Sequence, residues 1–255
     1  MRTIAGLLFT LMLVLASGCT GKNPGGKFSD SETDAVSVPD TGYTGIKKYL
    51  SNGTVLKEVS FKNGIRHGET KTFYAGGQLF QTFWYENDMK EDSARWFYLD
   101  GKVFRTTPYK KDTIDGIQIQ YYKDGKVKAK IGYVKGMRTH FFEEYSQEGK
   151  LLKNYPEIAV NVSDEYNTKG TYRIGLELSD KSEKVKFYRG EFTDGRFDTT
   201  VIKPIKTVDG KASINLKKTG TAASGEIGVI AEFITPFGNK HLASEKIELP
   251  YNDLK

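Results

Sequence analysis

The chain has few of the residues from which many catalytic and cross-linked sites are built. Its 255 residues include one cysteine and three histidines. A single cysteine excludes an intramolecular disulfide scaffold and a cysteine-based zinc site. Three scattered histidines offer little for metal binding or acid–base catalysis, and no HExxH, GxSxG, P-loop or GxGxxG motif occurs. We therefore expect a protein that is not an enzyme and has no cofactor.

Long apolar runs are also scarce. The uncharged, mostly apolar run over residues 4–16 is shorter than the roughly 20 residues that cross a bilayer. The composition of 38% hydrophobic and 27% charged residues is that of a soluble globular chain with one large domain or two small ones. Proline is rare (7), whereas glycine (27), tyrosine (15) and phenylalanine (15) are frequent. This balance favours short strands joined by tight turns.

The first residues have the features of an export signal. Arg2 precedes the apolar run, which ends in Leu15-Ala16-Ser17-Gly18-Cys19. A positive start and a short apolar core predict a signal peptide over residues 1–18. Its end resembles the lipobox of bacterial lipoproteins, although leucine is commoner at the position of Ala16. The resemblance implies that Cys19 is acylated and becomes the mature N-terminus. An ordinary secretory signal with an incidental cysteine is the alternative.

The resemblance to bacterial lipoproteins also implies a location. Thr20 follows the cysteine, where enterobacterial lipoproteins kept in the inner membrane carry aspartate, so it implies the outer membrane. Residues 19–41 are rich in Gly, Ser, Thr, Asp and Pro and predict a flexible tether. Fully extended, this tether reaches about 70 Å. The membrane, bound through acyl chains, is thus one expected partner.

Several residue types recur at a constant period of 24 over residues 42–155. Three columns that keep this step are strict glycine (Gly53, Gly77, Gly101, Gly125, Gly149), one aromatic position (Tyr49, Phe73, Phe97, Tyr121, Tyr145) and a second aromatic position (Phe61, Tyr85, Tyr109, Tyr133). Several columns in register without a gap indicate a tandem repeat. Asn, Gly or Asp before most of the glycines predicts type I′ turns, and a second turn lies near the middle of each repeat, as at Asn63-Gly64. Apolar and polar residues alternate between the turns, so each repeat is predicted to be one antiparallel hairpin.

These repeats resemble a known family. Phe61-Lys-Asn-Gly64-Ile-Arg-His-Gly68 is similar to the core of MORN repeats. The form Phe73-Tyr74-x-x-Gly77-x-Leu79 is similar to the bacterial MORN-variant subgroup of the YwqK type. Departures from the family glycines are Asp88, Asp92, Asp112 and His140. The resemblance implies an elongated ribbon of β-hairpins, and proteins of this subgroup are often labelled antitoxin-like.

After Pro156 the repeat period stops, and residues 156–255 form a second predicted domain. Its expected strands are residues 157–162, 171–178, 184–188, 197–202, 212–216, 226–233 and 242–249. Seven short strands in about 100 residues favour an immunoglobulin-like or fibronectin-like β-sandwich. The predicted fold is therefore all-β throughout, a hairpin meander followed by a sandwich.

Positive charge is concentrated in the repeats. Residues 42–155 contain 20 basic against 13 acidic residues, and ten of these bases fall in the stretch 101–138. Lys126, Lys128 and Lys130 step by two and are expected to share one strand face, with Arg138 nearby. Such a surface suits an anionic lipid, lipopolysaccharide, a glycan or an acidic protein. A solvated face that discourages edge pairing is the alternative, and an exported protein is not expected to bind nucleic acid.

Aromatic residues suggest a second candidate surface. Tyr85, Tyr109 and Tyr133 would form a ladder along the ribbon, either as cross-strand packing or as a platform for carbohydrate or peptide. Phe80, Thr82 and Trp84 are predicted to share the opposite face. If both faces are apolar there, one of them should be covered, with the second domain as a candidate.

Together these features predict a membrane-anchored, non-catalytic binding or scaffold lipoprotein of the bacterial envelope. Its repeat sheet would bind a protein partner, in one version as an antitoxin or immunity protein. The alternative is a binder of anionic lipid, lipopolysaccharide or glycan through the stretch 101–138.

Overall fold

The computed structural model describes residues 42–223 and 225–255, so the signal peptide, Cys19 and the tether of residues 19–41 lie outside the described residues. The described chain is almost entirely β-structure, and the prediction of an all-β fold is confirmed. Its one helix is the four-residue α1 (Tyr166–Lys169). No helix in this part of the chain is long and apolar enough to cross a bilayer.

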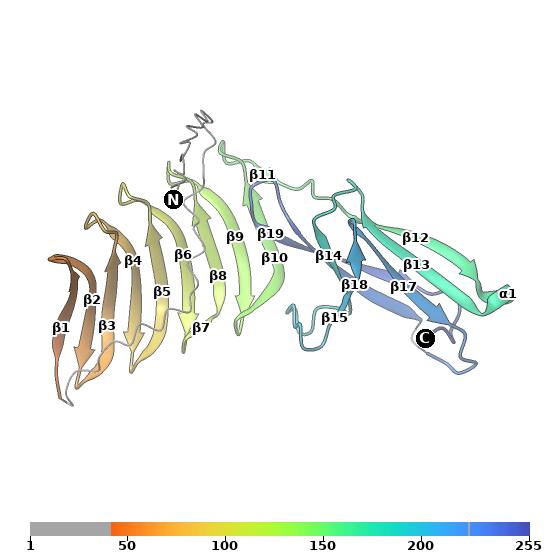
Figure 1. Ribbon diagram of the computed structural model, residues 1–255, viewed down its shortest axis with the longest axis horizontal. Helices are drawn as coiled ribbons and strands as arrows, with labels where there is room; N and C mark the ends of the chain where they lie inside the picture. The colour runs from red at the N-terminus through yellow and green to blue at the C-terminus, as the bar shows by residue number, and fades with distance from the viewer. Residues whose placement is uncertain (1–41, 224) are drawn as a thin grey trace, which may run out of the picture. The chain divides into compact units, whose positions relative to one another are not determined.

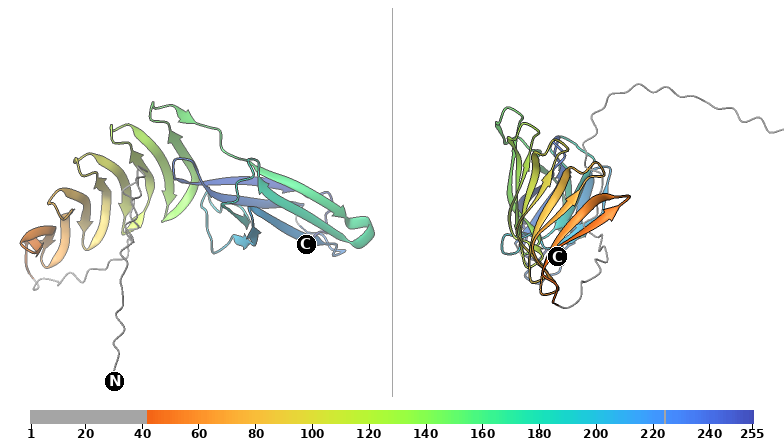
Figure 2. Two further views of the ribbon diagram at one scale, coloured as in Figure 1. Left: turned by 45° about the horizontal axis from the view of Figure 1, so that its top comes forward. Right: turned by 90° about the vertical axis from the view of Figure 1, so that its left-hand side faces the viewer.

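The repeats form one antiparallel sheet in which strands that follow one another in sequence lie side by side (Figure 1). The strands are bowed rather than flat (Figure 2). Their bounds are β1 (Gly45–Ser51), β2 (Thr54–Lys62), β3 (Ile65–Phe73), β4 (Leu79–Glu86), β5 (Met89–Phe97), β6 (Val103–Lys110), β7 (Thr113–Ile114), β8 (Gly116–Tyr121), β9 (Val127–Val134), β10 (Met137–Tyr145) and β11 (Leu151–Leu152). This is the predicted meander of hairpins.

The two kinds of turn differ from each other. At the second turn position, pairs such as Asn63-Gly64 have positive φ at both residues, which is the expected type I′ geometry. The glycine column was expected to be type I′ as well, and this is wrong for Gly77, Gly101, Gly125 and Gly149, because the residue before each does not have positive φ. The N–H of Gly77 donates to the carbonyl of Tyr74 (2.9 Å), and the N–H of Tyr74 to that of Gln78 (2.8 Å). This is a type I turn followed by a glycine bulge.

Adjacent glycines in one turn provide a test of this geometry. Gly77 has φ +84°, whereas Gly76 has an ordinary φ and a Cβ there would meet the flexible end of the Gln78 side chain. We expect Gly77→Ala to cost about 1 kcal/mol of unfolding free energy and Gly76→Ala to change it by less than about 0.5 kcal/mol. Urea unfolding of both variants measures this. Equal losses would contradict the assigned turn type.

A β-bulge near the start of the first strand of each hairpin disrupts the predicted alternation. In β9, Ala129 pairs with Gln120 and Val127 pairs with Tyr121, so Lys128 is an extra residue without a partner in the register. Equivalent bulges fall at Leu56, Phe80 and Phe104. A bulge places two successive residues against one on the partner strand. Side chains before and after it therefore do not keep the simple period of two.

The second part consists of two four-stranded antiparallel sheets. The first is ordered β12-β13-β17-β16 and the second β15-β14-β18-β19, the strand order of an immunoglobulin-like sandwich. Their bounds are β12 (Ile158–Glu165), β13 (Thr171–Leu178), β14 (Val185–Arg189), β15 (Lys203–Ile205), β16 (Thr207–Val208), β17 (Lys211–Lys217), β18 (Glu226–Ile234) and β19 (Lys240–Glu248). Both sheets contribute to one core, which includes Ile174, Leu216, Phe187 and Val229.

One predicted strand of the sandwich is absent. Residues 197–202 form a loop, and the strand of this part of the sandwich is β15, which begins directly after them. Asp198 closes a turn there, because its side chain accepts hydrogen bonds from the N–H (2.9 Å) and hydroxyl (2.6 Å) of Thr200. Ile202 packs with Ile230 and Leu242 in a small second cluster. The apolar residues of this segment cover a sheet rather than extend one.

Candidate functional site

A ladder of hydrogen bonds joins each type I′ turn to the preceding repeat. The N–H groups of Asp88, Asp112 and Gly136 donate to the carbonyls of Arg66, Lys90 and Ile114, at 2.9, 3.0 and 2.8 Å. The two aspartates stand where the family has glycine, and each adds a side-chain bond. Asp88 Oδ1 accepts from the N–H of Arg66 (2.9 Å), and Asp112 Oδ1 from that of Lys90 (2.9 Å). The departures from the repeat motif therefore strengthen contacts between turns.

Asp88 also pairs with the Arg66 side chain, whose Nε lies 2.9 Å from Oδ1. Burial by itself would raise the pKa of Asp88, but the hydrogen bonds and charge of Arg66 outweigh it and lower that pKa. The guanidinium of Arg66 lies 4.3 Å from the ring centre of Tyr85 in the next repeat. One arginine thus bonds to a turn and stacks on an aromatic ring.

A second ladder of hydrogen bonds runs through the tyrosine that begins each glycine turn. The hydroxyls of Tyr74, Tyr98 and Tyr122 donate to the carbonyls of Phe97, Tyr121 and Tyr145, at 2.8, 3.0 and 2.7 Å. Each bond reaches forward into the next repeat. Burial raises the pKa of all three hydroxyls. The tyrosines were visible in the repeat motif, but the spacing gave no sign of the carbonyls that they bind.

We expect Tyr98→Phe to lower the free energy of unfolding by about 1 kcal/mol, because it removes one half-buried hydrogen bond and keeps the ring contact with Phe104. Tyr121→Phe is the matched control, since within the described residues its hydroxyl makes no hydrogen bond. Urea unfolding should show a near-zero change for the control. A Tyr98→Phe variant as stable as the control would show that this ladder contributes nothing.

The sheet has two faces with different exposure. The buried face contains Val59, Thr70, Phe83, Ala94, Thr107, Gln118 and Ile131. The open face contains a continuous registered row, Glu58, Lys71, Thr82, Arg95, Thr106, Ile119, Lys130 and Glu143, in which the small Thr82 is itself buried. On the buried face the hydroxyl of Thr107 donates to Gln118 Oε1 at 3.1 Å, and the Arg105 guanidinium lies 3.9 Å from the centre of Trp96.

The predicted tyrosine ladder lies on the buried face. Tyr85 and Tyr109 are buried and Tyr133 is half-buried. Phe83 packs edge-on against Tyr109 at 5.9 Å, and Lys90 lies 5.2 Å from the Tyr109 ring centre. Burial raises the pKa of Tyr85 and Tyr133. These rings pack the sheet rather than form an exposed platform.

The expected grouping of Phe80, Thr82 and Trp84 is confirmed for Thr82 and Trp84, which share the open face, and is wrong for Phe80. Phe80 is a bulge residue and packs with the cluster of Ala94 and Trp96. Trp84 pairs with Glu69 on the open face and keeps 46% of its surface exposed. The second domain contacts β10 instead of covering this region.

The three lysines expected on one face are divided. Lys126 is exposed in a turn, where it pairs with Asp124 at 3.3 Å. Lys128 is the bulge residue of β9. Lys130 lies on the open face opposite Glu143, with its Nζ 2.9 Å from the carboxyl, and hydrogen bonds to Glu143 and Tyr145 raise its pKa. The prediction of a shared lysine face is therefore wrong.

The other bases of the stretch 101–138 are also dispersed. Lys102 and Lys123 lie near glycine turns, Lys111 and Lys135 lie in type I′ turns, and Arg105 lies on the buried face. Bases that are close in sequence alternate between the two ends of the hairpins, because each strand runs from one end of a hairpin to the other. The high density of bases in this stretch of the sequence therefore does not produce a positively charged patch on the surface.

Arg138 belongs to a junction between β10 and the sandwich. One of its terminal nitrogens donates to the carbonyl of Lys240 at 3.0 Å, and its own carbonyl accepts from Phe197 N–H at 2.7 Å. Burial lowers its pKa. Arg138 is thus engaged with this chain's own second domain.

Glu144 is the central polar group of the same junction and is completely buried. Its carboxyl oxygens accept hydrogen bonds from the Tyr155 hydroxyl (3.2 Å), the Thr235 hydroxyl (2.9 Å) and the Asn239 amide (2.7 Å). Burial, with the nearby Glu144, raises the pKa of Tyr155. This residue could not be singled out from the sequence, because a Glu-Glu pair is typical of a solvated surface.

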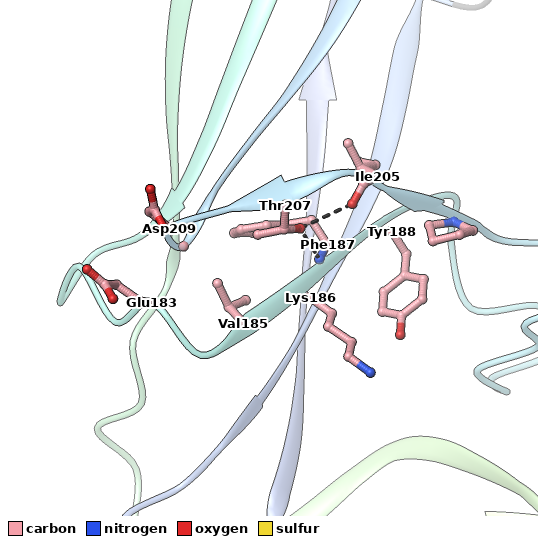
Figure 3. A pocket seen from close by; sticks show the side chains of 10 residues that line it. Glu183, Val185, Lys186, Phe187, Tyr188, Ile205, Thr207 and Asp209 are labelled. Atoms are coloured by element: carbon pink, nitrogen blue, oxygen red, sulfur yellow. Dashed lines mark hydrogen bonds between the residues drawn. The ribbon is translucent and has the colours of Figure 1, made fainter.

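Histidines and cavities supply no catalytic constellation in the described residues. His67, His140 and His241 lie on β3, β10 and β19, and no group of three His, Cys, Asp or Glu could hold a metal there. A pocket of about 300 Å³ lies beside β14, β15 and β16, and its lining side chains are drawn in Figure 3. Glu183 and Asp209 lie at one side of the view and Lys186 and Tyr188 at the other, so acid and base groups do not converge (Figure 3).

The comparisons with known proteins agree with the repeat geometry. Residues 66–87 and 114–135 match the family model described as MORN repeat variant. The two matches begin exactly two repeat periods apart, so they fall on equivalent parts of different hairpins. A search of curated proteins finds no match. The family match supports a repeat-based binding or scaffold protein.

Proposed function

We propose that this protein is a non-catalytic binding or scaffold module of the bacterial envelope that holds a protein partner on its repeat sheet. The observation that carries the proposal is the contrast between the two faces of this sheet. One face is filled by its own side chains, whereas the other exposes Trp84 and Ile117, each at 46%. The turn and tyrosine ladders brace the sheet from repeat to repeat. A braced surface loses little conformational entropy when it binds.

An acylated Cys19 is the second part of the proposal. The lipobox supports it, and the tether of residues 19–41 would let the sheet reach partners away from the outer membrane. An antitoxin or immunity role, in which the sheet blocks a toxin, is one version of this function. It rests on the resemblance to the YwqK-type subgroup.

Binding of anionic lipid, lipopolysaccharide or glycan through the stretch 101–138 receives less support. Its ten bases are dispersed, and Lys130 and Lys126 are already paired with acids. A field of one sign therefore does not build up over this stretch.

Site-specific photo-crosslinking tests the binding role. A photoreactive amino acid at Ile117, on the open face, should give a discrete adduct with one protein in the cell envelope. The matched control is Val208, which is exposed on β16 of the sandwich. No adduct from Ile117, or the same adducts from both positions, would overturn the proposed function.

Membrane fractionation tests the anchor independently. The wild-type chain should sediment with membranes, and Cys19→Ser should be released into the soluble fraction, because it lacks the acyl chains that bury methylenes in lipid. Mass spectrometry of the mature N-terminus gives the modification directly. A Cys19→Ser protein that stays with membranes would contradict acyl anchoring.

A further inference from the structure

The open face carries apolar side chains near its centre, among them Trp84, whose register partners are Glu69 and Glu91. Trp84 projects from β4, and Pro108 and Ile117 continue the same side of the sheet on β6 and β8. Ile119 lies two residues beyond Ile117 and pairs with Thr106. Trp84 has no aromatic neighbour among the ring contacts of the described residues, whereas the other tryptophan, Trp96, is buried. Exposed apolar side chains that gather on one face, rather than singly, mark interaction surfaces.

Ion pairs border the centre of the open face on both sides. Towards β1 the pairs are Lys48–Glu58 (3.1 Å) and Lys71–Glu69 (3.2 Å), and towards β10 the pair is Lys130–Glu143 (2.9 Å). These exposed pairs contribute little stability. Their opposite charges cancel, so the exposed Trp84 and Ile117 lie between borders of little net charge. Protein-binding surfaces have this layout.

Arg95 is an exposed base near this centre. It is exposed on β5 and pairs in register with Thr82 and Thr106, neither of which carries charge. Among the described residues it forms no ion pair with an acid. Glu91, on the same strand, is the register partner of Trp84, and its carboxylate accepts a hydrogen bond from the N–H of Lys111 (3.1 Å). A guanidinium beside apolar surface binds a carboxylate in bidentate geometry, and Trp and Arg are the residue types that dominate binding energy at interfaces.

We propose that Trp84, Arg95 and Ile117 form the centre of a docking surface for a protein segment that carries an Asp or Glu beside an apolar side chain. The carboxylate would pair with Arg95, and the apolar side chain would pack on Trp84 and Ile117. This inference rests on the proposed function and assigns the chemistry of the partner.

Peptide display tests the inference on the full chain held in detergent. A library of random 12-residue peptides is selected on the wild-type protein, with the double variant Trp84→Ala/Arg95→Glu as counter-target. Selected peptides should share an Asp or Glu within two residues of an apolar residue. A synthetic peptide of that type should bind Trp84→Ala and Arg95→Glu at least tenfold more weakly than wild type. Lys186→Glu, an equal charge change at an exposed position on β14 of the sandwich, is the control and should bind normally.

Charge reversal adds a result that misfolding would not produce. A synthetic peptide with Lys in place of its acidic residue should bind Arg95→Glu better than wild type. Emission of the buried Trp96, the remaining tryptophan in Trp84→Ala, reports whether that variant is folded. Peptides that bind wild type and the double variant equally, or no enrichment at all, would overturn the inference.

Two other results separate this inference from the proposed function. If the variants weaken binding to phosphatidylglycerol vesicles tenfold while no peptide distinguishes them, the face is a lipid surface and the inference is wrong. If the adduct from Ile117 persists in both single variants, the sheet binds a protein by other residues. The proposed function then stands without the docking chemistry.

Discussion

Replacing Glu144 by alanine is expected to lower the free energy of unfolding by about 3–5 kcal/mol. The change leaves the Tyr155 hydroxyl, the Thr235 hydroxyl and the Asn239 amide without their acceptor in a fully buried site. Each buried polar group that loses its partner costs about 1–3 kcal/mol. Urea unfolding followed by fluorescence and circular dichroism measures the loss.

Two further variants show whether the hydrogen bonds are the cause. Glu144→Gln keeps one carbonyl acceptor of similar shape and should lose less than the alanine variant. The neighbouring Glu143→Ala removes a half-exposed pair with Lys130 and should cost at most about 1 kcal/mol. If Glu143→Ala and Glu144→Ala are equally stable, the junction does not depend on this network.

His241 is expected to make the protein less stable in acid. Burial, and then the charge of Arg138, lowers the pKa of His241 from 6.5 to about 4. Its ring stacks on Tyr155 at 4.4 Å and meets Phe142 and Phe233 edge-on or tilted, and within the described residues Nδ1 has no hydrogen-bond partner. Protonation would place a second cation beside Arg138.

The sign of the effect follows from the two pKa values. Well above pH 6.5 the imidazole is neutral in both states, and stability does not depend on it. Between pH 6.5 and 4 the unfolded chain binds the proton and the folded chain does not, so the free energy of unfolding falls as pH falls. The loss is complete below pH 4. It amounts to at most about 3 kcal/mol, and we expect about 2 kcal/mol because the ring keeps partial contact with water.

His241→Phe keeps an aromatic ring and removes the titrating group. The difference in stability between wild type and this variant should therefore change by about 2 kcal/mol between pH 7 and 4, in favour of the variant in acid. His140→Gln, at an exposed position on β10, should retain the wild-type dependence. Parallel pH profiles for wild type and His241→Phe would show that this histidine is not the sensor.

Much of the fold could be predicted, because its requirements are local and recur. Asn63-Gly64 takes positive φ in a two-residue turn whatever surrounds it, and the next such turn, Asn87-Asp88, comes one repeat period later. Bulges could not be predicted in this way. Whether Lys128 has a partner depends on the register of β8 against β9, which is decided by hydrogen bonds between strands. The prediction that Lys126, Lys128 and Lys130 share one face was wrong for this reason.

Candidate sites were harder to predict than strands. Tyr85 and Tyr109 could be recognised as one column of the repeat. Such a repeated position is occupied by a packing residue here, since identical positions in neighbouring repeats contact one another. The residues that correspond to Trp84 in the other repeats are Ser60, Pro108 and Gly132, and those that correspond to Arg95 are Lys71, Ile119 and Glu143. An irregular residue on an open face has to be recognised by its exposure, which a sequence does not record.

The sequence by itself determined the hairpin, the period and the change of fold near Pro156, because turns and alternation are set by neighbouring residues. Only the tertiary structure decided which face is filled, where the bases lie and how β10 meets the sandwich. Those properties depend on pairs far apart in the chain, such as Glu144 with Asn239, whose contact arises when both domains are folded. The burial and the electrostatic environment of a residue at such a contact depend on all the groups that surround it in space, most of which are distant in the sequence.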